Sequence, residues 1–190
     1  MEEKIYNVLT ENEKHSDFYK KIFEKYLNAG YNIGNIPIPP LYFDNVASRN
    51  NNIFINENVY KQLEEIQDIT SQTNYEIPFC LLGYEQADGK IIFFNILKDT
   101  NNNSRLEANF DNIVPTLEAY LENLDLEKGH PIICKGHSHG QGNVSDNFSF
   151  GDLISAATFK NNIKDYIKSI NSQVSYKDID TVNLLLNPCG

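Results

Sequence analysis

Residues 76–97 read EIPFCLLGYEQADGKIIFFNIL, and this stretch decides the fold. It contains two apolar runs of strand length, at 76–85 and 90–97, on either side of the polar turn QADG. Apolar runs of this length that are separated by turn residues predict an antiparallel β-hairpin. A third run of the same kind, PIICKGHSH at 131–139, predicts a further strand.

Helical patterns alternate with these strands along the chain. A short strand is predicted at 53–55, and apolar residues then recur at helical spacing over 57–71 and again over 113–124. A third helix is predicted from about residue 149, and VNLLLN at 182–187 predicts a final strand. This alternation predicts an α/β domain with a mixed sheet flanked by helices.

The first 50 residues have a different pattern. Residues 11–29 predict an amphipathic helix, which we interpret as packing on the domain, with partner binding as the alternative. Residues 31–50 contain three prolines and end in a polar stretch, which is typical of a loop or linker. We therefore divide the chain into an N-terminal helical extension with its linker, residues 1–50, and a main domain, residues 51–190.

Charge and composition exclude several classes of function. The chain has 16 basic and 26 acidic residues and a net charge of −10, which argues against binding to nucleic acid or to an anionic membrane. Three cysteines are too few for a disulfide framework, the N-terminus lacks a signal-peptide pattern, and no apolar run is long enough to span a membrane. The expected location is the cytoplasm. The scarcity of arginine beside abundant asparagine favours a bacterial source.

The candidate metal-binding and catalytic residues are concentrated in His137-Ser138-His139 and in Ser149-Phe150-Gly151-Asp152. Side chains at positions i and i+2 of a strand project to the same face, so His137 and His139 can reach one metal ion. Asp152 falls in the first turn of the predicted helix, where a carboxylate is electrostatically favoured. Two imidazoles and one carboxylate suit Zn²⁺ and leave a fourth coordination position for water.

Each of these fragments also has a purely structural interpretation. Two histidines on one strand face often only form local hydrogen bonds, and Ser-x-x-Asp before an apolar helix is also a capping box. The combination of both fragments, with a glycine on each side of the histidines, favours a metal site.

These residues resemble the motif of the JAMM/MPN metalloprotease family, also called Mov34 or JAB domains. That motif has a glutamate on an early strand, usually in Glu-x-x-Gly-x-Leu-x-Gly, followed by His-x-His and Ser-x-x-Asp. Residues 76–83 match it at Glu76, Leu81 and Gly83, and the resemblance covers roughly residues 52–190. It implies a cytidine-deaminase-like α/β fold and zinc-dependent cleavage of peptide or isopeptide bonds.

The resemblance also implies a role for each matching residue. His137, His139 and Asp152 would bind zinc, and Glu76 would carry the proton of a metal-activated water to the leaving amine. Ser149 would donate a hydrogen bond to the developing oxyanion. Glu85 is the second candidate for the base. The implied partner is a peptide or protein substrate, with a ubiquitin-like conjugate as one candidate.

The sequence departs from the family pattern in three places. Phe79 stands where the family prefers glycine, Gly140 replaces the usual proline after the second histidine, and the loop to Ser149 is two residues longer. The sequence HSHG…NFSFGD is similar to that of JAB-like domains in bacterial and toxin-associated proteins.

Two alternatives to an active JAMM-type metalloprotease are considered. One is a catalytically inactive JAMM-like interaction module with the same fold. The other is a different class of zinc hydrolase, which the motifs disfavour: the His-x-Glu and Pro-Cys-x-x-Cys of nucleobase deaminases are missing, and residues 140–142 break the HxHxDH pattern of metallo-β-lactamases.

Overall fold

The computed structural model describes residues 5–8, 53–101, 104, 108–140, 150–170 and 179–186. Within these segments six strands form one mixed sheet, in the order β1-β2-β4-β3-β5-β6. The strands are β1 (Ile5–Val8), β2 (Ile53–Asn56), β3 (Pro78–Glu85), β4 (Ile91–Lys98), β5 (His130–Ser138) and β6 (Asp180–Leu186).

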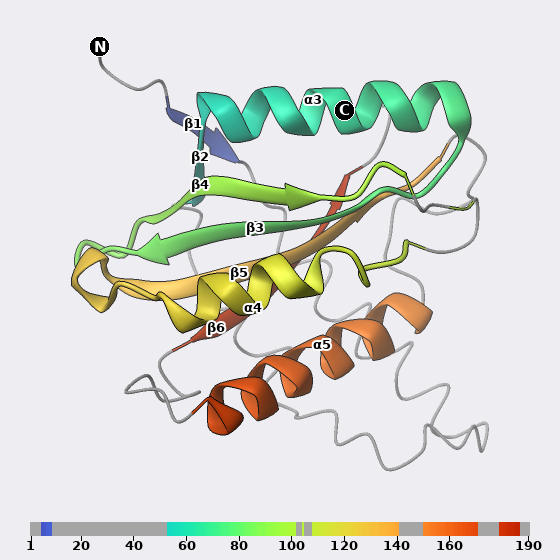
Figure 1. Cartoon of the computed structure of the whole chain (residues 1–190). Helices are drawn as coiled ribbons and strands as arrows, with labels where there is room; N and C mark the ends of the chain where they lie inside the picture. Colours follow the sequence, from blue (N-terminus) through green and yellow to red (C-terminus); the bar gives the residue numbers. More distant parts are fainter. Residues whose placement is uncertain are drawn as a thin grey trace.

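Helices cover both faces of this sheet. Helix α3 (Glu57–Thr73) lies along one face, and helices α4 (Val114–Glu122) and α5 (Phe150–Ser169) lie on the other (Figure 1). A short 3-10 helix, Leu126–Lys128, follows α4. The predicted α/β class, with a mixed sheet flanked by helices, is confirmed for the described part of the chain. No helix in that part is long and apolar enough to cross a membrane.

The pairing of the strands places β3 in the interior of the sheet, between β4 and β5. Strand β3 is antiparallel to β4, as the predicted hairpin requires, and it is also antiparallel to β5. The pairs β2–β4 and β5–β6 are parallel. Gly89 in the hairpin turn has a φ of +81°, a conformation that glycine adopts without steric cost.

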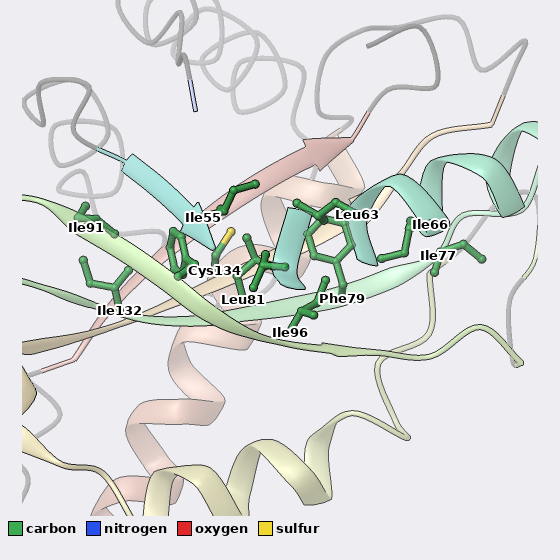
Figure 2. Packing of buried hydrophobic residues seen from close by; sticks show 12 residues of the cluster. Ile55, Leu63, Ile66, Ile77, Phe79, Leu81, Ile91, Ile96, Ile132 and Cys134 are labelled. Atoms are coloured by element: carbon green, nitrogen blue, oxygen red, sulfur yellow. The ribbon is translucent and has the colours of Figure 1, made fainter. Parts of the chain in front are cut away.

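Alternation along the strands divides the apolar residues into two cores. One core lies between the sheet and α3, where Phe79 and Leu81 pack with Leu63 and Ile66 (Figure 2). The other lies against α4 and α5 and includes Cys80 and Leu82 from the same strand, together with Ile113, Leu117, Leu121, Ile133, Phe159, Ile163, Ile167 and Ile179. Burial on both faces explains why β3 and β5 read as continuous apolar runs rather than alternating ones.

The first departure from the family motif has a packing explanation. Phe79 is fully buried and lies directly opposite Gly136 on β5. A Cβ atom built on Gly136 would overlap with the Phe79 ring. The large residue on β3 is therefore accommodated by the absence of a side chain on β5, one residue before His137.

The remaining sequence predictions have mixed outcomes. The helix at 57–71 and the strand at 182–187 are present with slightly different ends. The helix predicted over 113–124 ends earlier, at Glu122, and Gly129 caps the separate 3-10 helix that follows it. Residues 5–8 form β1, antiparallel to β2, although their sequence pattern predicted no strand. The predicted helix at 11–29 and linker at 31–50 lie outside the described residues, and the domain boundary at residue 50 stays a prediction.

Candidate metal centre

The two histidines lie together at the end of β5. His137 is the penultimate residue of the strand and His139 follows it, and both side chains are buried. The backbone N–H of His139 donates to the carbonyl of Leu186 at 3.0 Å, so the chain stays attached to β6 beyond the strand end. The two Nε2 atoms are 3.0 Å apart, and their rings thus face a common point.

Asp152 completes the cluster from the other side of the interface between sheet and helix. It is the third residue of α5, in the first turn, and its side chain is half-buried. Its Oδ1 lies 3.3 Å from Nε2 of His137, and its Oδ2 lies 3.9 Å from Nε2 of His139. The ligand atoms of the three residues all lie within 4.8 Å of one another, so this buried group could hold a metal ion.

Two of the distances between these groups match those around a tetrahedral ion. Tetrahedral zinc with bonds of about 2.0–2.1 Å separates neighbouring ligand atoms by about 3.3 Å. The two Nε2 atoms are 3.0 Å apart and Oδ1 of Asp152 lies 3.3 Å from Nε2 of His137, both close to that value, whereas Asp152 approaches His139 only to 3.9 Å, through its other oxygen, Oδ2. The ligand atoms lie up to 4.8 Å apart, so the Asp152 and His139 side chains would have to move closer together for one ion to bind all three residues.

The protonation state of His137 also suits a ligand. Burial, with smaller contributions from the neighbouring His139 and Lys135, lowers the pKa of His137 to about 4, although Asp152 opposes the shift. A metal ligand must be a neutral imidazole, since a protonated ring has no free lone pair. His137 is therefore in the binding-competent form at neutral pH.

Ser138, between the two histidines, points to the opposite face and holds the strand end in place. It is fully buried, and its Oγ accepts a hydrogen bond from the backbone N–H of Ile77 at 3.0 Å. The same Oγ is 2.6 Å from the hydroxyl of Thr70 on α3, in a second hydrogen bond. One hydroxyl thus links β5 to the start of β3 and to α3, directly behind the candidate ligands.

Glu76 precedes β3 at the same end of the sheet. Pro78 pairs with His137, and the N–H of Ser138 donates to the carbonyl of Ile77 at 3.1 Å. Continuation of this register places Glu76 opposite His139, on the face of the sheet that carries both histidines. The Glu76 side chain is half-buried, and its backbone N–H donates to the carbonyl of Ser104 at 2.9 Å.

The second candidate base, Glu85, lies at the far end of β3. It pairs with His130, the first residue of β5. Glu85 is seven residues beyond Pro78, a separation of roughly 23 Å along a strand that rises about 3.3 Å per residue. The register therefore separates Glu85 from the histidine pair and favours Glu76.

The segment that joins the histidines to α5 is described only at its first residue, and Ser149 lies outside the described residues. Gly140 packs against the backbone of Asn74, where an added Cβ would lie 2.7 Å from the carbonyl oxygen. Any side chain at this position would displace the chain just after His139. This close approach gives a physical reason for glycine where the family has proline.

Sequence reasoning missed Lys135. This residue lies two positions before His137 on the same face of β5, and its side chain is buried. Burial lowers the pKa of Lys135 to about 8, although Cys80 and Asp152 counteract part of that effect. The available signal was a single charge inside the apolar run PIICKGHSH, at i−2 from a candidate ligand.

Comparison with known proteins adds no relative: no family model matches the chain, and no curated protein or solved structure shows significant similarity to it. The motif and the geometry of the three converging side chains are therefore the features that indicate a function for this chain.

Proposed function

We propose that this protein is a zinc-dependent hydrolase of the JAMM/MPN type that cleaves peptide or isopeptide bonds. The observation that carries the proposal is the convergence of His137, His139 and Asp152, within 4.8 Å, at the junction of a central strand and a helix start. A mixed sheet with helices on both faces is compatible with the cytidine-deaminase-like fold that the motif implies.

Zinc is the metal that this donor set favours. Imidazole nitrogens suit zinc and other late transition metals, whereas magnesium and calcium prefer sites made entirely of oxygen. Three protein ligands leave one position open, which is the arrangement of catalytic zinc rather than of structural zinc. When bound, zinc would supply a Lewis acid and lower the pKa of a coordinated water.

The chain itself would supply the proton transfer. Glu76 lies on the histidine face by register, and a carboxylate there can accept a proton from water and deliver it to the leaving amine. The motif assigns Ser149 to the stabilisation of negative charge on the substrate carbonyl. His137, His139 and Asp152 would hold the metal, and the burial of the two histidines limits the access of bulk water.

The first experiment measures metal content. Protein purified without chelator should contain close to one zinc per chain by elemental analysis, and the double variant His137→Ala/His139→Ala should contain almost none. His130→Ala is the matched control because His130 lies at the opposite end of β5 and should leave the zinc content unchanged. Zinc that remains in the double variant would refute the site.

The second experiment separates the enzyme from the inactive interaction module. Zinc-loaded protein is incubated with a broad peptide library and with isopeptide-linked ubiquitin-like conjugates, and cleavage is followed by mass spectrometry. Turnover that Glu76→Gln abolishes supports the hydrolase. Stoichiometric zinc without cleavage of either substrate class would favour the interaction module.

A further inference from the structure

Lys135 places a cation in the interior of the molecule, close to the candidate metal centre. It lies on the interior strand β5, and the residue is only 8% exposed. Lysine is seldom buried to this degree, because the ammonium loses its hydration and needs other partners. The partners that it has in this structure therefore indicate what the residue does.

Two of these partners belong to α5. The ammonium of Lys135 forms a short hydrogen bond with the hydroxyl of Ser155 and lies 5.9 Å from the centroid of the Phe159 ring. Ser155 and Phe159 follow Asp152 by three and seven residues, so all three occupy one face of the helix. The face of α5 that carries Asp152 beside the histidines thus also carries, in its next two turns, the residues that contact Lys135.

A third partner comes from the segment before α4. The ammonium lies 4.4 Å from the centroid of the Phe110 ring, within the range of a cation–π interaction. Phe110 and Phe159 are themselves in contact, with their centroids 6.3 Å apart. Lys135 therefore connects β5, α5 and the segment before α4 at one point.

We propose that Lys135 is a positioning residue, which ties the first turns of α5 to β5 and so holds Asp152 against His137 and His139. The inference rests on the proposed metal centre, since it assigns Lys135 a role in setting the geometry of that centre. It makes Lys135 and Ser155 determinants of metal affinity, although neither is a ligand.

The positive charge of Lys135 should weaken metal binding, whereas its tether to α5 should strengthen it. An ammonium two residues from a ligand repels a bound dication, so Lys135→Met removes both the tether and this repulsion. Ser155→Ala removes the hydrogen bond and leaves the charge in place. Ser155→Ala is therefore the informative single variant, and the pair of variants forms a double-mutant cycle in which the repulsion cancels.

The test is the affinity for Zn²⁺, measured by competition with a chromogenic chelator. Ser155→Ala should weaken zinc binding about 10-fold, at the lower end of the range for residues that orient ligands. In the Lys135→Met background the same substitution should have no effect. Thr158→Ala, which removes an exposed hydroxyl one turn further along α5, is the control and should leave the affinity unchanged. An unchanged affinity in Ser155→Ala would overturn the proposal.

A second measurement needs no metal and separates the tether from the metal centre. In the metal-free protein, Ser155→Ala and Lys135→Met should each increase amide hydrogen exchange at residues 150–156, while exchange in β5 stays as in the wild type. Wild-type protein that binds no zinc would refute the proposed function, and the exchange data would still decide whether the tether exists. Exchange at residues 150–156 that is unchanged in both variants refutes the tether.

Discussion

At the scale of single residues, substitution of Glu76 tests whether the candidate centre catalyses hydrolysis. Glu76→Gln keeps the size of the side chain but removes the base, so zinc content should stay at the wild-type level. Turnover should fall by about 10²–10⁴-fold, the usual contribution of a positioned acid–base group. The measurements are zinc content and initial rate on any substrate found by the library screen.

Glu85→Gln is the matched control for this prediction. Glu85 lies at the opposite end of the same strand, paired with His130, and its substitution should leave turnover nearly unchanged. Activity that is lost in Glu85→Gln and kept in Glu76→Gln would contradict the register argument.

Ser138 is predicted to stabilise the fold behind the ligands. Ser138→Ala removes the acceptor of the Ile77 N–H and the partner of the Thr70 hydroxyl, both in a fully buried position. A buried polar group without a partner costs about 1–3 kcal/mol, so urea unfolding of the metal-free protein should show a loss of this size. Ser71→Ala, an exposed serine on α3, should change stability by less than about 0.5 kcal/mol. Equal effects of the two variants would contradict the role of the buried hydroxyl.

The two buried thiols are predicted to be chemically inert. Burial raises the pKa of Cys80 to about 12, and burial also raises the pKa of Cys134. The thiolate is the reactive form of cysteine, and both groups are protonated at neutral pH. Iodoacetamide should therefore fail to label Cys80 and Cys134 in native protein and label both in denaturant, as mapped by mass spectrometry. Rapid labelling of either residue in the native state would show that the sheet opens at that position.

At the scale of elements, the contact between β3 and β5 supports a further prediction. Gly136→Ala places a Cβ about 2.2 Å from the edge of the Phe79 ring and should destabilise the protein by about 1–3 kcal/mol, the usual cost of an overpacked core. Phe79→Leu in the same chain should recover part of that loss, because it removes the ring that the new Cβ meets. Stability is measured by urea unfolding of the two single variants and the double variant. Strictly additive losses would show that the two positions are not coupled.

The elements that the sequence predicted correctly are those in which periodicity and burial agree. Helix α3 has Val59, Leu63 and Ile66 buried at helical spacing, and the hairpin has Gly89 at a turn position that requires positive φ. Strand β1 could not be predicted in this way, because it is a four-residue strand paired by its backbone with β2. Backbone pairing of so short a segment leaves almost no pattern in the side chains.

The candidate site was predictable to the extent that it depends on local geometry. Same-face projection on a strand brought His137 and His139 together, and the first turn of a helix supplied Asp152. The choice between Glu76 and Glu85 depends on the register of β3 against β5, which is a property of the pairing and not of either strand alone. The role of Lys135 depends on Phe110 and Ser155, which are distant from it in sequence.

At the scale of the whole molecule, the order of the strands separates β1 from the candidate metal centre. Strand β1 lies at one edge of the sheet, and β2, β4 and β3 stand between it and β5. The pattern of residues 31–50, with prolines at 37, 39 and 40, predicts an exposed connection. Cleavage of this connection should therefore leave the ligands at the far side of the sheet undisturbed.

Limited proteolysis under native conditions tests this arrangement. We expect the first cuts between residues 31 and 50, with the fragment that begins near residue 51 keeping its zinc after size-exclusion chromatography. The cut sites are read by intact-mass spectrometry, and zinc is measured in the same fractions. Loss of β1 would expose the edge of β2, so the fragment should also self-associate more than the intact chain does. Resistance of the whole stretch 31–50, or loss of zinc on the first cut, would mean that this stretch, and not only β1, belongs to the domain that supports the centre.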